Sequence, residues 1–180
     1  MTKDARPLLI AIAAHTAMAM LGVILAVGYL ASRIIEGTSV MVGIIATLLL
    51  IPLSLEELQA GALQSPWFQT IGDFLKQAKF LGLSAVSLPI LGLGGLLFTW
   101  MLFRFRLVPR VIAVVGLIGY ALVFFVSITG WFGLVDVTPG GNGTHFAVPV
   151  AVFEIILLPF WLFFNGFKTA EAPERTVAAE

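Results

Sequence analysis

The chain has no cysteine and little charge. Without Cys, disulfides, thiolate nucleophiles and Cys-ligated zinc or iron–sulfur sites are excluded. Only 11% of its 180 residues are charged, whereas an ordinary soluble domain has about a quarter. Ten basic side chains cancel ten acidic ones. No net field draws the protein to an anionic polymer, so nucleic acid is not an expected partner.

Apolar sequence takes the place of charge. Hydrophobic residues make up 59% of the chain, and the mean hydropathy is +1.05. This composition excludes a soluble globular enzyme and a disordered chain, and it predicts a small multi-pass membrane protein. The apolar runs are continuous rather than alternating, which favours helices over a membrane β-barrel.

Charged residues mark the ends of five apolar segments. A helix needs about 20 apolar residues to cross a hydrocarbon core about 30 Å thick. Four segments meet this length, whereas the second is marginal because its densest part is short and includes Pro52. We therefore predict an all-α, polytopic transmembrane bundle, one domain over residues 1–168. Its predicted spans lie at about 7–32, 38–55, 79–103, 108–134 and 146–167.

The polar segments carry helix-start signals. A capping box at Ser54 and Glu57 predicts a short helix over 55–63. A Ser-Pro pair then starts an amphipathic helix over 66–78. We expect this helix to lie in the outer interface, and the alternative is a polar-faced extension of the third span. The polar tail at 169–180 is expected to be disordered.

The basic residues leave two topologies open. Lys and Arg favour the cytoplasmic side, so the turn that holds Arg104, Arg106 and Arg110 is placed inside. Five spans then put the N-terminus outside, with six basic residues inside and four outside. If segment 39–53 enters and returns instead, the N-terminus lies inside and the tally becomes seven to three. We predict five spans, because a single helix there needs no buried loop. The expected location is the bacterial cytoplasmic membrane, with the C-terminus inside.

Glu154 and His15 are the polar groups expected within the spans. A charged side chain at the centre of a bilayer costs about 2.5–3.5 kcal/mol on insertion scales. Glu154 therefore either exchanges a proton or cation, or ties the last helix to a neighbour. His15 either pairs with Glu154 or is a hydrogen-bonded interior histidine. Arg104, Arg106 and Arg110 either bind lipid phosphates or anchor the positive-inside turn.

Three prolines fall inside the predicted spans. A proline has no backbone N–H, so it leaves the carbonyl four residues earlier without its helical donor. The prolines are Pro89, Pro149 and Pro159, and the freed carbonyls are those of Ala85, His145 and Ile155.

No catalytic motif is present. The chain has no Walker loop, no HExxH motif and no GxSxG motif. We therefore predict no catalytic residues, no metal site, no cofactor and no enzymatic activity.

Several motifs in the C-terminal half resemble a known family. They are Pro109-Arg110, Gly-Leu-Ile-Gly over 116–119, Phe153-Glu154, Trp161-Leu162 and Gly166-Phe167. With the stretch LSLEELQA, they resemble the bacterial multi-pass membrane proteins described as domain of unknown function 4386, over about residues 53–168. The N-terminal third departs from that pattern, whose members have about six spans. The resemblance implies an inner-membrane helical bundle and no assigned activity.

Two classes of function remain. We predict a small bundle that binds a lipid or apolar ligand, or that is a subunit of a membrane assembly. Its expected partners are membrane lipids and either further copies of the chain or another membrane subunit. The alternative is a small proton-linked transporter that uses Glu154. The first class predicts that Glu154→Gln is tolerated, and the second predicts lost flux with the fold retained.

Overall fold

The computed structural model describes residues 5–59, 66–138 and 140–166, and all regular structure within them is helical. In chain order the elements are α1 (Ala5–Gln59), α2 (Pro66–Phe80), the π-helix η1 (Leu81–Val86), α3 (Ser87–Arg104), α4 (Arg110–Trp131), the 3₁₀-helix η2 (Asn142–Ala147), α5 (Val148–Ala151), the π-helix η3 (Val152–Leu157) and α6 (Leu158–Asn165). The predicted all-α fold is confirmed. The predicted tail at 169–180 lies outside the described residues.

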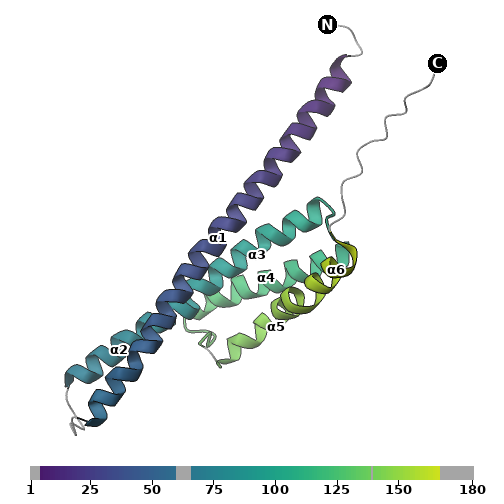
Figure 1. Cartoon of the computed structure of the whole chain (residues 1–180). Coiled ribbons are helices and arrows are strands. Elements are labelled where there is room, and N and C mark those ends of the chain that lie inside the picture. Colours follow the sequence, from purple (N-terminus) through teal and green to yellow (C-terminus); the bar gives the residue numbers. More distant parts are fainter. Residues whose placement is uncertain (1–4, 60–65, 139, 167–180) are drawn as a thin grey trace.

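Four helical segments are long and apolar enough to cross a membrane, one fewer than the five predicted. They are Ile10–Gln59, Pro66–Arg104, Arg110–Trp131 and Asn142–Asn165. The difference arises at the start of the chain. The segments at 7–32 and 38–55 form the single helix α1 (Figure 1).

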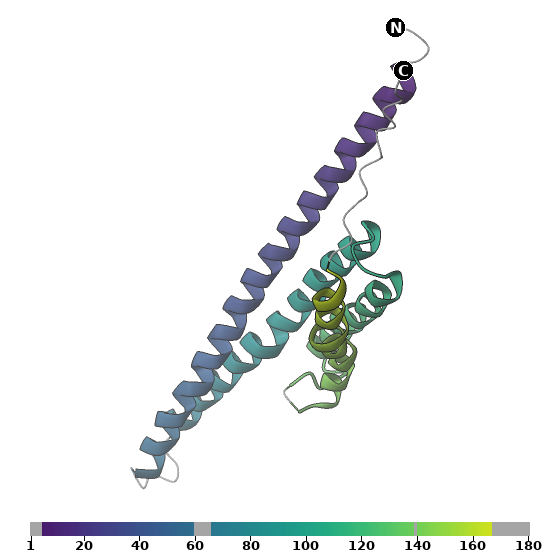
Figure 2. The ribbon, with the colours of Figure 1, turned by 45° about the vertical axis from the view of Figure 1, so that its right-hand side comes forward.

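Helix α1 does not break because its central polar groups are satisfied within the helix. Arg33 Nη1 donates to Glu36 Oε2 at 2.9 Å, one turn away. The hydroxyls of Thr38 and Ser39 donate to the carbonyls four residues earlier. The 55 residues of α1 extend over about 80 Å at 1.5 Å per residue. Its N-terminal part therefore continues beyond the end of α3 (Figures 1 and 2).

The two short helices predicted at 55–63 and 66–78 are not separate helices but parts of longer ones. The capping box does not start a new helix, because α1 runs through to Gln59, and residues 60–63 lie outside the described part of the chain. The amphipathic segment at 66–78 forms most of α2, which continues without a loop through η1 into α3. This is the alternative in which the amphipathic helix extends the third span.

The helices pack in chain order through small residues. Helix α1 lies against α2, η1 and α3, and α4 packs between α3 on one side and α5 and η3 on the other. A Cβ added to Gly92 on α3 would lie 2.8 Å from the Cα of Phe124 on α4. The main hydrophobic core includes Leu102, Tyr120 and Phe153, each fully buried. It therefore lies between α3, α4 and η3, whereas most large side chains of α1 are exposed.

Each carbonyl expected to be freed by a proline lies in a turn that is not α-helical. Ala85 is in η1, His145 in η2 and Ile155 in η3. The Ala85 carbonyl accepts a hydrogen bond of 2.7 Å from Trp131 Nε1 at the end of α4. This bond replaces the donor that Pro89 lacks, and it fixes the end of α4 against η1.

Candidate functional site

Three charged side chains and a tyrosine meet in the middle of the bundle. Arg33 Nη2 lies 2.7 Å from Glu154 Oε1, although the two residues are 121 positions apart in sequence. The same Nη2 donates to the Tyr120 hydroxyl at 3.3 Å, and that hydroxyl donates to Glu154 Oε1. Arg33 Nη1 bonds Glu36. We call these four residues the charged cluster.

The charged cluster lies at mid-depth of the predicted membrane region. Helix α4 has 22 residues, so at 1.5 Å per residue it extends over about 33 Å, close to the thickness of the hydrocarbon core. Tyr120 lies halfway along it. Arg33 and Glu154 contact Tyr120 and therefore lie at the same level. At this depth, ionisable side chains are costly and mark functional sites by default.

Two adjacent glycines on α3 bring the cluster together. Gly94 faces the side chain of Ser32 on α1, and Gly95 faces the ring of Tyr120 on α4. A Cβ at either position would collide with the side chain opposite. Because neither glycine has a side chain, α1 and α4 approach α3 closely from its two sides. Arg33 is then long enough to extend past α3 to Tyr120.

The cluster is acceptor-rich and partly open. One guanidinium faces the two carboxylates of Glu36 and Glu154, so with all groups ionised it carries one negative charge in excess. The guanidinium also lies 5.1 Å from the ring centroid of Tyr29, a cation–π contact. Tyr120 is fully buried, but the side chains of Arg33 and Glu154 are 26% and 39% exposed. A partner can therefore reach the ion pair from outside the bundle.

Of the predicted intramembrane pair, only Glu154 lies in the cluster. His15 precedes Arg33 by 18 residues, or about 27 Å of helix. It lies with Met18 and Phe105 along a groove of about 370 Å³ near the end of α3. The structure therefore does not bring His15 and Glu154 together, because the partner of Glu154 comes from the middle of α1.

Arg104, Arg106 and Arg110 are exposed at the turn between α3 and α4. Arg104 Nη2 lies 3.2 Å from Met18 Sδ on α1. Arg106 has a positive φ of 54°, which lets the chain reverse direction within the turn. The three guanidinium groups thus lie at one end of the bundle, away from the charged cluster.

The sequence analysis missed Arg33, Glu36 and Tyr120. It placed the first two in a loop, because charge usually marks the end of a span. Their spacing of three residues was the available signal, since opposite charges at that spacing pair on one helix face. Tyr120 gave no signal of its own, because a tyrosine inside an apolar helix is unremarkable without knowledge of its neighbours.

The loop after α4 is organised by Asp136. Its carboxylate accepts the hydroxyl of Thr138 at 2.6 Å and the backbone N–H of Thr138 at 2.9 Å. These two bonds favour the charged form and lower the pKa of Asp136 below its ordinary value. Across residues 5–59, 66–138 and 140–166, no three His, Asp or Glu side chains are grouped as metal ligands.

Comparison with known proteins identifies a family but no activity. No curated protein and no solved structure matches the chain. A family model, described as domain of unknown function (DUF4386), matches residues 7–166. The match extends further toward the N-terminus than the predicted resemblance over 53–168, and it includes both ends of the Arg33–Glu154 ion pair. The chain is a helical membrane protein and belongs to the DUF4386 family.

Proposed function

We propose that the protein is a membrane-embedded binding protein that holds a partner through Arg33 and Glu154. The observation that carries this proposal is the ion pair itself, which lies at mid-depth and is open to the outside of the bundle. A charge that faces hydrocarbon is costly, so a polar group that covers the pair gains free energy by doing so. Arg33 supplies N–H donors and Glu154 supplies acceptors to such a group.

The surroundings favour a partner that is mostly apolar. Exposed side chains next to the cluster include Ile34, Ile155 and Ile156. A ligand that reaches the ion pair therefore needs one polar group and an apolar body. A lipid, a small apolar ligand with a polar head, and a helix from another membrane subunit or a second copy of the chain all have this form.

A proton-linked transporter is the second candidate. The observation in its favour is that two carboxylates share one guanidinium. A proton or a monovalent cation would balance the excess negative charge, as in the carboxylate relays of membrane carriers. Glu154 also lies in the π-helix η3, and single π turns within helices are common at functional sites.

Four crossings put the two ends of the chain on the same side of the membrane, and we propose that this side is the cytoplasm. Helix α1 runs antiparallel to α3, because Gly22 meets Phe105 while Gly43 meets Leu83. The start of α1 and the α3–α4 turn are therefore at the same end. The positive-inside rule favours a cytoplasmic location for this end, because the turn carries three arginines. Lys76 and Lys79 then lie outside, and the proposed location is a bacterial cytoplasmic membrane.

The proposal is tested by native mass spectrometry of the protein released from membranes without added ligand. We expect a reproducible bound mass or a discrete oligomer on the wild type. Glu154→Gln and Arg33→Gln should lose it, whereas Glu56→Gln, an exposed glutamate elsewhere on α1, should retain it. Because Glu154 contacts the partner in this proposal, its replacement is no longer expected to be neutral. A bare wild-type monomer, or a bound mass that survives both cluster variants, would contradict the proposal.

The transporter is tested separately in proteoliposomes with an imposed pH gradient. If the protein is a transporter, wild-type vesicles take up protons and Glu154→Gln vesicles do not. The Glu154→Gln protein should nevertheless melt at a temperature close to that of the wild type. Equal proton uptake by wild-type and Glu154→Gln vesicles would exclude this role.

A further inference from the structure

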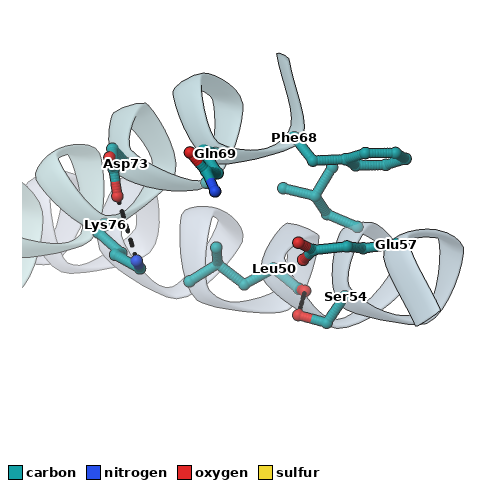
Figure 3. Close-up of a pocket in the computed structure, with 9 residues that line it drawn as sticks. Leu50, Ser54, Glu57, Phe68, Gln69, Asp73 and Lys76 are labelled. Carbon is teal, nitrogen blue, oxygen red and sulfur yellow. Dashed lines mark hydrogen bonds and ion pairs between the residues drawn. The ribbon is translucent and has the colours of Figure 1, made fainter. Parts of the chain in front are cut away.

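A second cavity lies far from the charged cluster, between the end of α1 and helix α2. It has a volume of about 400 Å³, within the usual range for small-molecule sites, about 300–1,000 Å³. Helix α1 contributes Leu50, Leu53, Ser54 and Glu57, and α2 contributes Phe68, Gln69, Gly72, Asp73 and Lys76. Figure 3 shows Glu57 and Gln69 pointing into the space between the two helices.

The cavity is lined by both apolar and charged side chains. Leu50, Leu53 and Phe68 are the large apolar lining residues, and Phe68 is only 7% exposed. Glu57 on α1 and Asp73 on α2 supply carboxylates toward the two ends of the cavity (Figure 3). Lys76 is 3.1 Å from Asp73 at the exposed mouth of the cavity (Figure 3). Two carboxylates and one ammonium leave one negative charge in excess, so a ligand that brings N–H donors and positive charge is favoured.

We propose that this cavity binds a primary ammonium group carried on a short apolar chain. The ammonium donates to Glu57, and the chain packs on the leucines and Phe68. None of the residues that line the cavity belongs to the charged cluster, so the proposal is independent of that cluster.

The position of the cavity indicates that the ligand arrives from water. Trp131 at the end of α4 bonds the carbonyl of Ala85, which marks the end of the bundle on this side. Gly72 in the cavity wall precedes Ala85 by 13 residues, or about 20 Å of helix. The headgroup region of a bilayer adds only about 5–8 Å beyond the hydrocarbon on each side. A soluble amine therefore fits this position better than the ethanolamine headgroup of a phospholipid.

The test measures binding of labelled n-butylamine to the full-length protein in maltoside micelles by equilibrium dialysis. Butanol and butyrate share its chain but are neutral or negative. We expect saturable binding of the amine alone. Glu57→Gln should weaken it by about 2- to 5-fold, the effect of a partly exposed ion pair. Glu56→Gln, at the neighbouring exposed position outside the cavity, should leave it unchanged.

A variant with the opposite expected sign separates loss of binding from loss of fold. Lys76→Gln removes the positive charge that opposes the amine and balances Asp73, so it should tighten amine binding by about threefold. A misfolded protein would not show tighter binding. Addition of phosphatidylethanolamine distinguishes the two sources of the ammonium: we expect no competition, and competition would assign the same site to a lipid headgroup. Equal binding of amine and butanol, or equal amine binding by wild type and Glu57→Gln, would overturn the proposal.

Discussion

Removal of Arg33 should destabilise the bundle more than removal of Glu154. Arg33→Met leaves both Glu36 and Glu154 without a cation at mid-depth. Removing one partner of a buried ion pair costs about 3–5 kcal/mol, and one charge at the bilayer centre costs about 2.5–3.5 kcal/mol. Because the pair is partly exposed, we expect about 3 kcal/mol. Glu154→Gln leaves Arg33 bonded to Glu36 and keeps an amide that Arg33 and Tyr120 can reach. A cost of about 1 kcal/mol is expected for it.

The double variant measures the coupling between the two residues. After Arg33→Met, the change Glu154→Gln removes one of two uncompensated carboxylates and should therefore be favourable or neutral. The double variant should then cost at least about 1 kcal/mol less than the sum of the two single variants. The assay is reversible unfolding in lipid–detergent bicelles, followed by tryptophan fluorescence. Arg104→Met, at the exposed turn, is the matched control. Additive costs, or an Arg33→Met variant within about 0.5 kcal/mol of that control, would refute the reasoning.

Three further predictions concern two helix contacts and the loop after α4. In the same unfolding assay, Trp131→Phe should cost about 1–3 kcal/mol because it leaves the carbonyl of Ala85 without its donor. Trp161→Phe should be neutral because its buried Nε1 has no partner among the described residues. Equal costs for the two variants would contradict both expectations. Gly92→Ala should cost about 1–3 kcal/mol because the added methyl group overpacks against α4. Gly37 faces open space, so Gly37→Ala should stabilise α1 by up to about 1 kcal/mol. A neutral Gly92→Ala variant would contradict the close packing of α3 on α4. Thr138→Val removes one of the two Thr138 bonds, so the pKa of Asp136 should rise toward its ordinary value in an NMR titration. The stability that the charged carboxylate supplies at neutral pH should become smaller, and it should be lost at a higher pH as the solution is acidified. An unchanged titration would contradict the assigned bonds.

The helical class was predictable from the sequence because apolar length is a property of each segment alone. Four of the five apolar segments reach the length that a membrane span requires, and the structure is helical in all five. That the first two segments join into one helix was not predictable in this way. Charged residues usually mark the end of a membrane span, whereas Arg33 and Glu36 neutralise each other on one face of a continuous helix.

The candidate site was predictable only in part. Glu154 stood out because a lone carboxylate in an apolar segment needs a partner. Its actual partner depends on which helices touch, and this is decided by Gly94 and Gly95, where α1 and α4 approach α3. The sequence shows that these residues are small, but it does not show what faces them. His15 was therefore as reasonable a partner as Arg33 until the helices were placed.

The π-helices η1 and η3 change the direction in which the helices that follow them, α3 and α6, present their side chains. Successive residues of an α-helix are about 100° apart around its axis. A turn that takes up one more residue than an α-turn therefore rotates everything beyond it by about that angle. A helical wheel drawn over 142–165 or 66–104 without a break thus assigns the wrong faces after η3 and η1. Deleting one residue from η3 would keep the helix and turn α6 by roughly a quarter revolution relative to Glu154, so the length of this segment is as specific a requirement as its residues.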